Sequence, residues 1–218
     1  MTARQKKLCL LLCLCLFFIP AHAFAAAREF VVTGLFDGDT LRLADGRRLR
    51  LAGIDCPELG HGAGPDQYYG REALALSRGL VKGAGVRLEH VGADHYGRLV
   101  AEVLLPDGRS LNLLLVREGA AFAYWHKGMD SAFFEKLLAA QRNAMAERRG
   151  AWAFVLDMAS ARASYVGNMA SRRFFSSGCK GGAQTGAARR IVFASLEDAF
   201  AAGHAPARHC ATWPLVKR

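Results

Sequence analysis

Residues 37–58 read DGDTLRLADGRRLRLAGIDCPE, and this stretch decides the fold. Two short runs with alternating leucines, 40–43 and 48–54, flank an Asp-Gly pair, which is typical of a tight β-hairpin turn. In the second run the leucines lie on one face and Arg48 and Arg50 on the other, because side chains alternate along a strand. The stretch therefore predicts a hairpin that presents arginines opposite its core side.

The flanking sequence extends this hairpin into a small barrel. Further β-rich runs lie on both sides of it, and three segments have apolar residues at helical spacing. The predicted strands are 29–36, 40–43, 48–54, 86–91 and 98–105, and the predicted helices are 70–82, 111–118 and 130–150. A Gly-rich loop is expected over 59–69. Five short strands with three helices predict an α+β fold built on a five-stranded, closed OB-fold β-barrel.

Composition limits the class of protein and locates its charge. The chain has 218 residues, of which 52% are hydrophobic, so it can form a packed core and is not wholly disordered. Its formal net charge is +10. Residues 24–157 contain 17 basic and 17 acidic residues, whereas residues 158–218 contain nine basic and two acidic ones. We therefore expect the C-terminal part, rather than the barrel, to tether nucleic acid or a partner electrostatically.

The first 25 residues have the layout of a secretory signal peptide. A basic start precedes the apolar stretch 8–19, and a small-x-small site follows it. We predict a signal peptide over 1–23, with cleavage after Ala23 or Ala25, and a secreted or periplasmic protein with no stable membrane span. The alternative, an uncleaved membrane anchor, is weaker because the dense apolar part is shorter than the ~20 residues that a span needs.

Cleavage would also change the number of cysteines. Three of the six belong to the signal peptide, so Cys56, Cys179 and Cys210 remain. In an oxidising compartment the simplest arrangement is one disulfide and one free thiol.

Three stretches place acids and arginines beside turns, at 37–40, 50–58 and 96–98. Hydrolysis of a phosphodiester requires a cation, donors for the charge that develops on the phosphate, and a base for the attacking water. Carboxylates with a carbonyl suit a hard cation such as Ca²⁺, and guanidinium forks suit phosphate. Each stretch alone is more often a turn, a loop or a solvated strand face. Together they indicate phosphodiester chemistry.

In this order the stretches resemble the staphylococcal nuclease-like (thermonuclease) family. The similarity covers about Phe30 to Trp152, and its motifs are DGDT at 37–40, RLAGIDCPE at 50–58, YGREA at 69–73, DHYGR at 94–98, LNLLLVREG at 111–119 and the closing Trp152. The resemblance implies an OB-fold barrel with three helices. It also implies Ca²⁺-dependent hydrolysis of DNA and RNA with little sequence preference, leaving 3′-phosphate ends.

The resemblance further implies roles for individual residues. The metal ligands would be Asp39, Asp55 and the backbone carbonyl of Cys56, and the catalytic residues would be Arg50, Glu58 and Arg98. Glu58 would act as the general base or position the attacking water, and the two arginines would hold the phosphate and its transition-state charge. The spacing from Asp55 to Glu58 across Pro57 agrees, because a rigid turn can hold both carboxylates near one cation.

Substrate binding is expected at His95, Tyr96 and Tyr124, which could contact a phosphate and stack on a base. Family members often have lysine at the position of His95. Packing of these rings in the core or at its rim is an equally open interpretation.

Beyond Trp152 the sequence changes character. Residues 153–163 resemble a linker, and we predict a nuclease domain over 28–157 and a small, basic α/β module over 163–212. The module resembles a degenerate Ada-type zinc-binding domain through the run Tyr165-Val166-Gly167-Asn168 and the cysteines Cys179 and Cys210.

Two of the four zinc-ligand positions of that domain are occupied by Phe175 and Ala207. The resemblance therefore favours a disulfide between Cys179 and Cys210 over a residual zinc site that His204 or His209 would complete.

The sequence thus predicts an exported, monomeric, Ca²⁺-dependent nuclease that acts on DNA and RNA. The main alternative is a catalytically inactive nucleic-acid-binding OB-fold module. That alternative would leave gaps among the predicted metal and catalytic positions, and every one of these positions is occupied by the expected residue.

Overall fold

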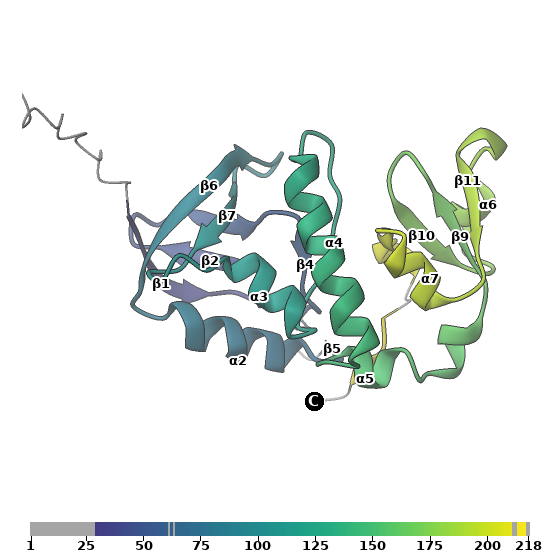
Figure 1. Ribbon diagram of the computed structural model, residues 1–218, viewed down its shortest axis with the longest axis horizontal. Coiled ribbons are helices and arrows are strands. Elements are labelled where there is room, and N and C mark those ends of the chain that lie inside the picture. Colours follow the sequence, from purple (N-terminus) through teal and green to yellow (C-terminus); the bar gives the residue numbers. More distant parts are fainter. Residues whose placement is uncertain (1–28, 61, 63, 211–212, 217–218) are drawn as a thin grey trace, which may run out of the picture.

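The computed structural model describes residues 29–60, 62, 64–210 and 213–216, so the predicted signal peptide lies outside the described residues. Five strands form a closed barrel in the order β1-β2-β3-β7-β6 (Figure 1). These strands are β1 (Phe30–Leu35), β2 (Thr40–Leu43), β3 (Arg48–Leu51), β6 (Gly85–Ala93) and β7 (Leu99–Leu104). The barrel confirms the predicted OB-type fold.

Three helices pack around the barrel: α2 (Gly70–Val81), α3 (Leu111–Arg117) and α4 (Ser131–Ala146). The apolar side chains of α4 that the sequence places on one face are buried. Both α3 and α4 begin at a capping side chain, because Ser110 accepts a hydrogen bond from the backbone of the third helical residue and Asp130 does the same for α4. The expected helices are therefore present, with ends shifted by a few residues.

The predicted strand 48–54 is divided in two in the structure. After β3, the chain turns at Gly53, which has a φ of 73°, and continues as the short strand β4 (Ile54–Asp55). The strand β4 leaves the barrel and pairs with β8 (Phe122–Ala123). This break places Asp55 at the edge of the barrel.

The C-terminal part forms a second, four-stranded sheet in the order β11-β9-β10-β12. Its elements are β9 (Tyr165–Asn168), β10 (Arg173–Ser176), α6 (Lys180–Ala183), η2 (Ala187–Arg189), β11 (Arg190–Phe193), α7 (Leu196–Ala201), β12 (Ala205–Pro206) and η3 (Arg208–Cys210). A disulfide joins Cys179 to Cys210 in the structure, with their Cα atoms 5.9 Å apart. We refer to residues 163–216 as the C-terminal module.

The segment 153–163 is not an extended linker, which corrects the sequence-based interpretation. It forms α5 (Trp152–Val155) and the 3₁₀ helix η1 (Ala159–Arg162), and Val155 and Ala161 are buried. The reason is that these small and apolar side chains pack in a shared core with Trp152 of α5 and Phe200 of α7.

Helix α4 lies between the barrel and the C-terminal module (Figure 1). One buried side chain on it connects both sides, because Gln141 accepts a hydrogen bond from Ala123 N at 2.7 Å and donates one to Phe200 O at 2.7 Å. The rings of Phe122 and Trp152 pack against those of Phe200 and Trp213. The two parts therefore share one apolar interface.

The last described strand returns to the barrel. In the predicted loop 59–69, the strand β5 (Asp66–Gln67) pairs with β13 (Leu215–Val216), a pairing that the sequence did not predict. Trp213 Nε1 also donates a hydrogen bond to Tyr68 O at 2.9 Å.

Among the helices in the described part of the chain, none has the length and apolar character needed to cross a bilayer.

Candidate active site

Asp39, Arg50 and Asp55 form a buried ionic cluster. Arg50 makes ion pairs with both carboxylates through its two terminal nitrogens, and Asp39 and Asp55 are only 3% and 6% exposed. Arg50 lies on the face of β3 opposite the barrel leucines, as predicted, yet it is buried as well. Buried charges persist only when they are paired, and here one guanidinium is paired with two carboxylates.

The hairpin and the turn before β2 hold the cluster in place. Thr40 of β2 lies opposite Arg50 of β3, which brings Asp39 next to the arginine. Asp39 N donates to Asp37 Oδ1 at 3.0 Å, and Asp39 Oδ2 accepts from Cys56 N at 2.6 Å. The Cys56 thiol is buried, and burial raises its pKa. Its backbone, rather than its sulfur, therefore contributes to the cluster.

Glu58 is positioned by the loop that follows β4. Its N–H donates to Gln67 Oε1 at 2.8 Å, and its carbonyl accepts from Gln67 N at 2.9 Å. The Glu58 side chain is 45% exposed. Partial burial raises the pKa of its carboxyl group, and the nearby carboxylates of Asp55 and Asp37 act in the same direction.

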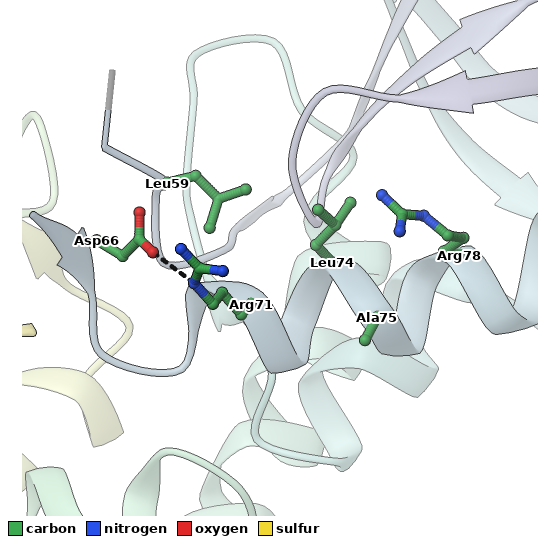
Figure 2. Close-up of a pocket in the computed structure, with 6 residues that line it drawn as sticks. All are labelled: Leu59, Asp66, Arg71, Leu74, Ala75 and Arg78. Carbon is green, nitrogen blue, oxygen red and sulfur yellow. Dashed lines mark hydrogen bonds and ion pairs between the residues drawn. The ribbon is translucent and has the colours of Figure 1, made fainter. Parts of the chain in front are cut away.

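A second carboxylate stabilises the same loop. Buried Asp66 accepts hydrogen bonds from Gly60 N at 2.9 Å and from Arg71 Nε of α2 at 2.7 Å. Figure 2 shows the hydrogen bond from Arg71. A pocket of about 380 Å³ lies beside this pair, lined by Leu59, Asp66 and side chains of α2. None of the predicted site residues lines that pocket, so we assign Asp66 a structural role in holding the loop.

The predicted substrate residues line one large cavity of about 920 Å³. Among its lining residues are Arg50, His95, Tyr96, Arg98 and Tyr124. Arg98 donates from Nε to Asp94 Oδ2 at 2.7 Å, so it reaches the cavity but does not join the Asp39–Arg50–Asp55 cluster. Tyr96 is 73% exposed, whereas one face of the Tyr124 ring is covered by the guanidinium of Arg173, 3.5 Å from the ring centroid.

The structure adds a residue to this site that sequence reasoning missed. Arg208 of the C-terminal module binds Asp55 Oδ1 through Nη2 at 2.9 Å, and the same nitrogen lies 3.6 Å from Glu58 Oε1. The Asp55 carboxylate raises the pKa of the Arg208 guanidinium. The excess of basic residues beyond position 157 pointed to the module as a whole, but nothing in the sequence near Arg208 indicates that it reaches the barrel.

The acidic residues fit a hard divalent cation. Asp39, Asp55 and the carbonyl of Cys56 offer only oxygen atoms, which are the ligands that Ca²⁺ prefers. Asp39 uses both carboxylate oxygens in hydrogen bonds and ion pairs, whereas Asp55 Oδ2 has no hydrogen-bond partner within the described residues. Asp55 Oδ2 is therefore available to a cation. The single positive charge of Arg50 neutralises only part of the negative charge of Asp39 and Asp55.

Comparison with known proteins places the chain in a family. The model of the staphylococcal nuclease homologue family matches residues 48–154, which include most of the barrel and end before the C-terminal module. An uncharacterized endonuclease of Escherichia coli is 36% identical over 124 residues, which cover 56% of this chain and 74% of that protein.

Two further relatives support the same family. An uncharacterized endonuclease of Haemophilus influenzae is 35% identical over 126 residues, covering 56% of this chain and 65% of that protein. The thermonuclease of Staphylococcus hyicus is 32% identical over 134 residues, covering 59% of this chain and 78% of that protein. With the closed barrel and the matched range, these similarities show that the chain belongs to the staphylococcal nuclease family.

Proposed function

We propose that this chain is a Ca²⁺-dependent nuclease that hydrolyses phosphodiester bonds of DNA and RNA with little sequence preference and leaves 3′-phosphate ends. The observation that carries the proposal is the buried pair of carboxylates, Asp39 and Asp55, around Arg50, with Glu58 positioned beside them. Family membership and the names of the relatives, endonuclease and thermonuclease, support nuclease activity.

In the proposed mechanism, Asp39, Asp55 and the Cys56 carbonyl would hold Ca²⁺, which when bound would offset negative charge on the scissile phosphate. Glu58 accepts a proton from the attacking water, or orients that water. It is suited to this because its side chain is only partly exposed while its backbone is fixed by Gln67. Arg50 donates to a phosphate oxygen through the N–H groups that do not bind Asp39 or Asp55.

Arg98 has a complementary role in the same cavity as Arg50. Its Nε donates a hydrogen bond to Asp94, which holds the planar guanidinium in place in the lining of a cavity that Arg50 also lines. Fixed donors stabilise charge that develops in the transition state more than they stabilise the substrate, and they therefore raise kcat.

The decisive experiment replaces the proposed base. We expect Glu58→Gln to lower kcat on single-stranded DNA by about 10²-fold or more, because it removes the proton acceptor while preserving shape. Glu135→Gln, an exposed glutamate on α4, is the matched control and should have wild-type activity. Excess chelator should abolish hydrolysis by the wild type, and end-group analysis should find 3′-phosphates.

One result would refute the assignment of the base, and another would refute nuclease activity itself. Near-wild-type kcat in Glu58→Gln would exclude Glu58 as the base. A wild-type protein that binds DNA but does not hydrolyse it at any Ca²⁺ concentration would favour the inactive nucleic-acid-binding module.

We also propose that the protein is exported after cleavage of residues 1–23 and acts as a monomer. The arrangement of the N-terminal sequence supports export, as does the disulfide between Cys179 and Cys210, since such bonds persist in oxidising compartments. A mature protein that retains residue 1, or a stable dimer in light scattering, would contradict these two points.

A further inference from the structure

Arg208 reaches the candidate active site from a part of the chain that lies outside the family match. It is separated from Asp55 by 153 positions, yet its Nη2 donates to Asp55 Oδ1 at 2.9 Å. The same nitrogen lies 3.6 Å from Glu58 Oε1. A residue of the C-terminal module is therefore in direct contact with the carboxylates of the barrel.

The backbone on both sides of Arg208 is fixed. Before it, β12 pairs with β10, and Ala207 N donates to Phe174 O at 2.9 Å. After it, Cys210 is bonded to Cys179. A side chain whose backbone is held at both ends loses less entropy when it binds a ligand, so Arg208 is well placed to serve as a binding residue.

Most of the hydrogen-bonding capacity of Arg208 is available. Its side chain is 65% exposed, and its contacts to Asp55 and Glu58 all use Nη2. Within the described residues, Nε and Nη1 have no hydrogen-bond partner. The N–H groups of Nε and Nη1 can therefore each donate to an anion while Nη2 remains on the carboxylates.

Arg208 is also a neighbour of Arg50. Both guanidinium groups donate to the same atom, Asp55 Oδ1, and neither uses Oδ2. Arg208 therefore brings a second positive charge to the cluster without occupying the oxygen that remains available on Asp55. A residue that blocked the site would instead bind Asp55 Oδ2.

Two cavities meet at Arg208. The large cavity, which contains Arg50 and Arg98, has Arg208 in its lining. A second cavity of about 480 Å³ is lined by Arg208 as well, together with Glu58, Phe122 and Trp213. A chain that continues past Glu58 from the first cavity towards the second would pass Arg208.

We propose that Arg208 binds a backbone phosphate of the nucleic-acid substrate next to the phosphate that is cleaved, so that the C-terminal module completes the substrate site. This inference rests on the proposed nuclease site. A phosphate is the ligand that suits open guanidinium N–H groups beside a second arginine, because charge-assisted hydrogen bonds from arginine to phosphate oxygens are strong. A nucleic-acid strand bound past Glu58 has such a phosphate on either side of the scissile phosphate.

The test compares two arginines of the same module. Arg208→Ala removes the proposed contact. Arg190→Ala removes the same charge from an exposed position on β11, the strand at the opposite edge of the sheet from β12. Binding of a fluorescein-labelled single-stranded oligothymidylate is measured by anisotropy in EDTA at several salt concentrations, and kcat and KM are measured separately with Ca²⁺.

We expect Arg208→Ala to weaken oligonucleotide binding about tenfold or more relative to Arg190→Ala, as loss of a charge-assisted hydrogen bond predicts. The salt dependence should fall by about 0.7 in log-log slope, the value for one phosphate contact on a single strand. KM should rise in parallel while kcat stays within about threefold. Arg208→Lys should lie between, because it keeps the charge but loses the fork.

Equal oligonucleotide affinities for Arg208→Ala and Arg190→Ala would overturn the inference. So would an Arg208→Ala variant with higher kcat/KM than the wild type, since that result would identify Arg208 as an obstruction. The binding measurement in EDTA needs no hydrolysis, so it separates this inference from the nuclease proposal. If Glu58→Gln retains activity while Arg208→Ala loses affinity, only the assignment of the base fails.

Discussion

At the scale of single residues, the site depends on charged side chains that are buried together as ion pairs. Alternation along β3 predicts correctly that Arg50 faces away from the barrel leucines. It cannot predict that Arg50 is buried, because burial results from Asp39 and Asp55, which arrive from a turn and from a separate strand. The same limit applies to Arg208, whose partner Asp55 is 153 positions away.

Gly38 shows how closely the turn before β2 approaches its surroundings. A Cβ atom at this position would lie 2.8 Å from Cys56 Sγ and 3.1 Å from Ala73 Cβ. We expect Gly38→Ala to lower the free energy of unfolding by about 1–3 kcal/mol, measured by urea denaturation, because the core has no space for another methyl group. Adding Cys56→Ala should recover part of this loss.

Gly79 of α2 provides the control for this substitution. A Cβ at Gly79 would meet no described atom within 4 Å, and the residue lies in an exposed part of the helix. Gly79→Ala should therefore stabilise the protein by up to about 1 kcal/mol. If Gly38→Ala is as stable as the wild type, the close packing of the turn against Cys56 is wrong.

At the scale of elements, local sequence signals predicted the helices well. They did not predict pairings between segments that are far apart in the sequence. The helix predicted over 130–150 is α4, and Asp130, the first residue of the predicted range, is its N-cap. The strand β5 was expected to be part of a loop, because its two residues carry no strand pattern and are ordered by pairing with β13. A two-residue strand is defined by its partner, and sequence pattern alone cannot supply the partner.

His204, in the turn between α7 and β12, links protonation to stability. It is buried against the Phe193 ring of β11, and burial, helped by Arg172 and Arg173, holds its pKa below the ordinary value of 6.5. The unfolded chain therefore binds a proton that the folded chain does not, so the free energy of unfolding decreases as the pH falls below about 6.5.

We expect the thermal midpoint to decrease less between pH 7.5 and pH 5.5 in His204→Gln than in the wild type. His209→Gln, which changes an exposed histidine of the same module, should keep the wild-type pH dependence. Identical pH profiles for the wild type and His204→Gln would show that another group controls this range. Differential scanning calorimetry at both pH values provides the comparison.

At the scale of the whole molecule, barrel and C-terminal module form one body around a shared aromatic core. Phe200 is fully buried, and its ring lies 4.9 Å from that of Trp152 and 5.4 Å from that of Phe122, centroid to centroid. The barrel and the four-stranded sheet of the C-terminal module are formed by separate parts of the chain. Their packing against each other depends on side chains from both, which no local pattern in the sequence reveals.

We expect Phe200→Ala to destabilise the protein by about 3–5 kcal/mol and to do so for both parts in a single transition. Guanidinium unfolding followed by tryptophan fluorescence and by far-UV circular dichroism should give coincident curves. Val192→Ala, a substitution at a residue that is 63% exposed, should change stability by less than about 0.5 kcal/mol. A barrel transition that is unaffected by Phe200→Ala would show that the two parts unfold independently.

The contact between Trp213 and Tyr68 has a consequence for the order in which the protein is built. The two residues are 145 positions apart, and Trp213 Nε1 bonds the carbonyl of Tyr68 in the loop that holds Glu58. During synthesis the barrel leaves the ribosome well before residue 213, so this loop receives the support of Trp213 only after the C-terminal module has been made. A protein assembled in this order has its barrel strands before it has the hydrogen bond that supports the loop around Glu58.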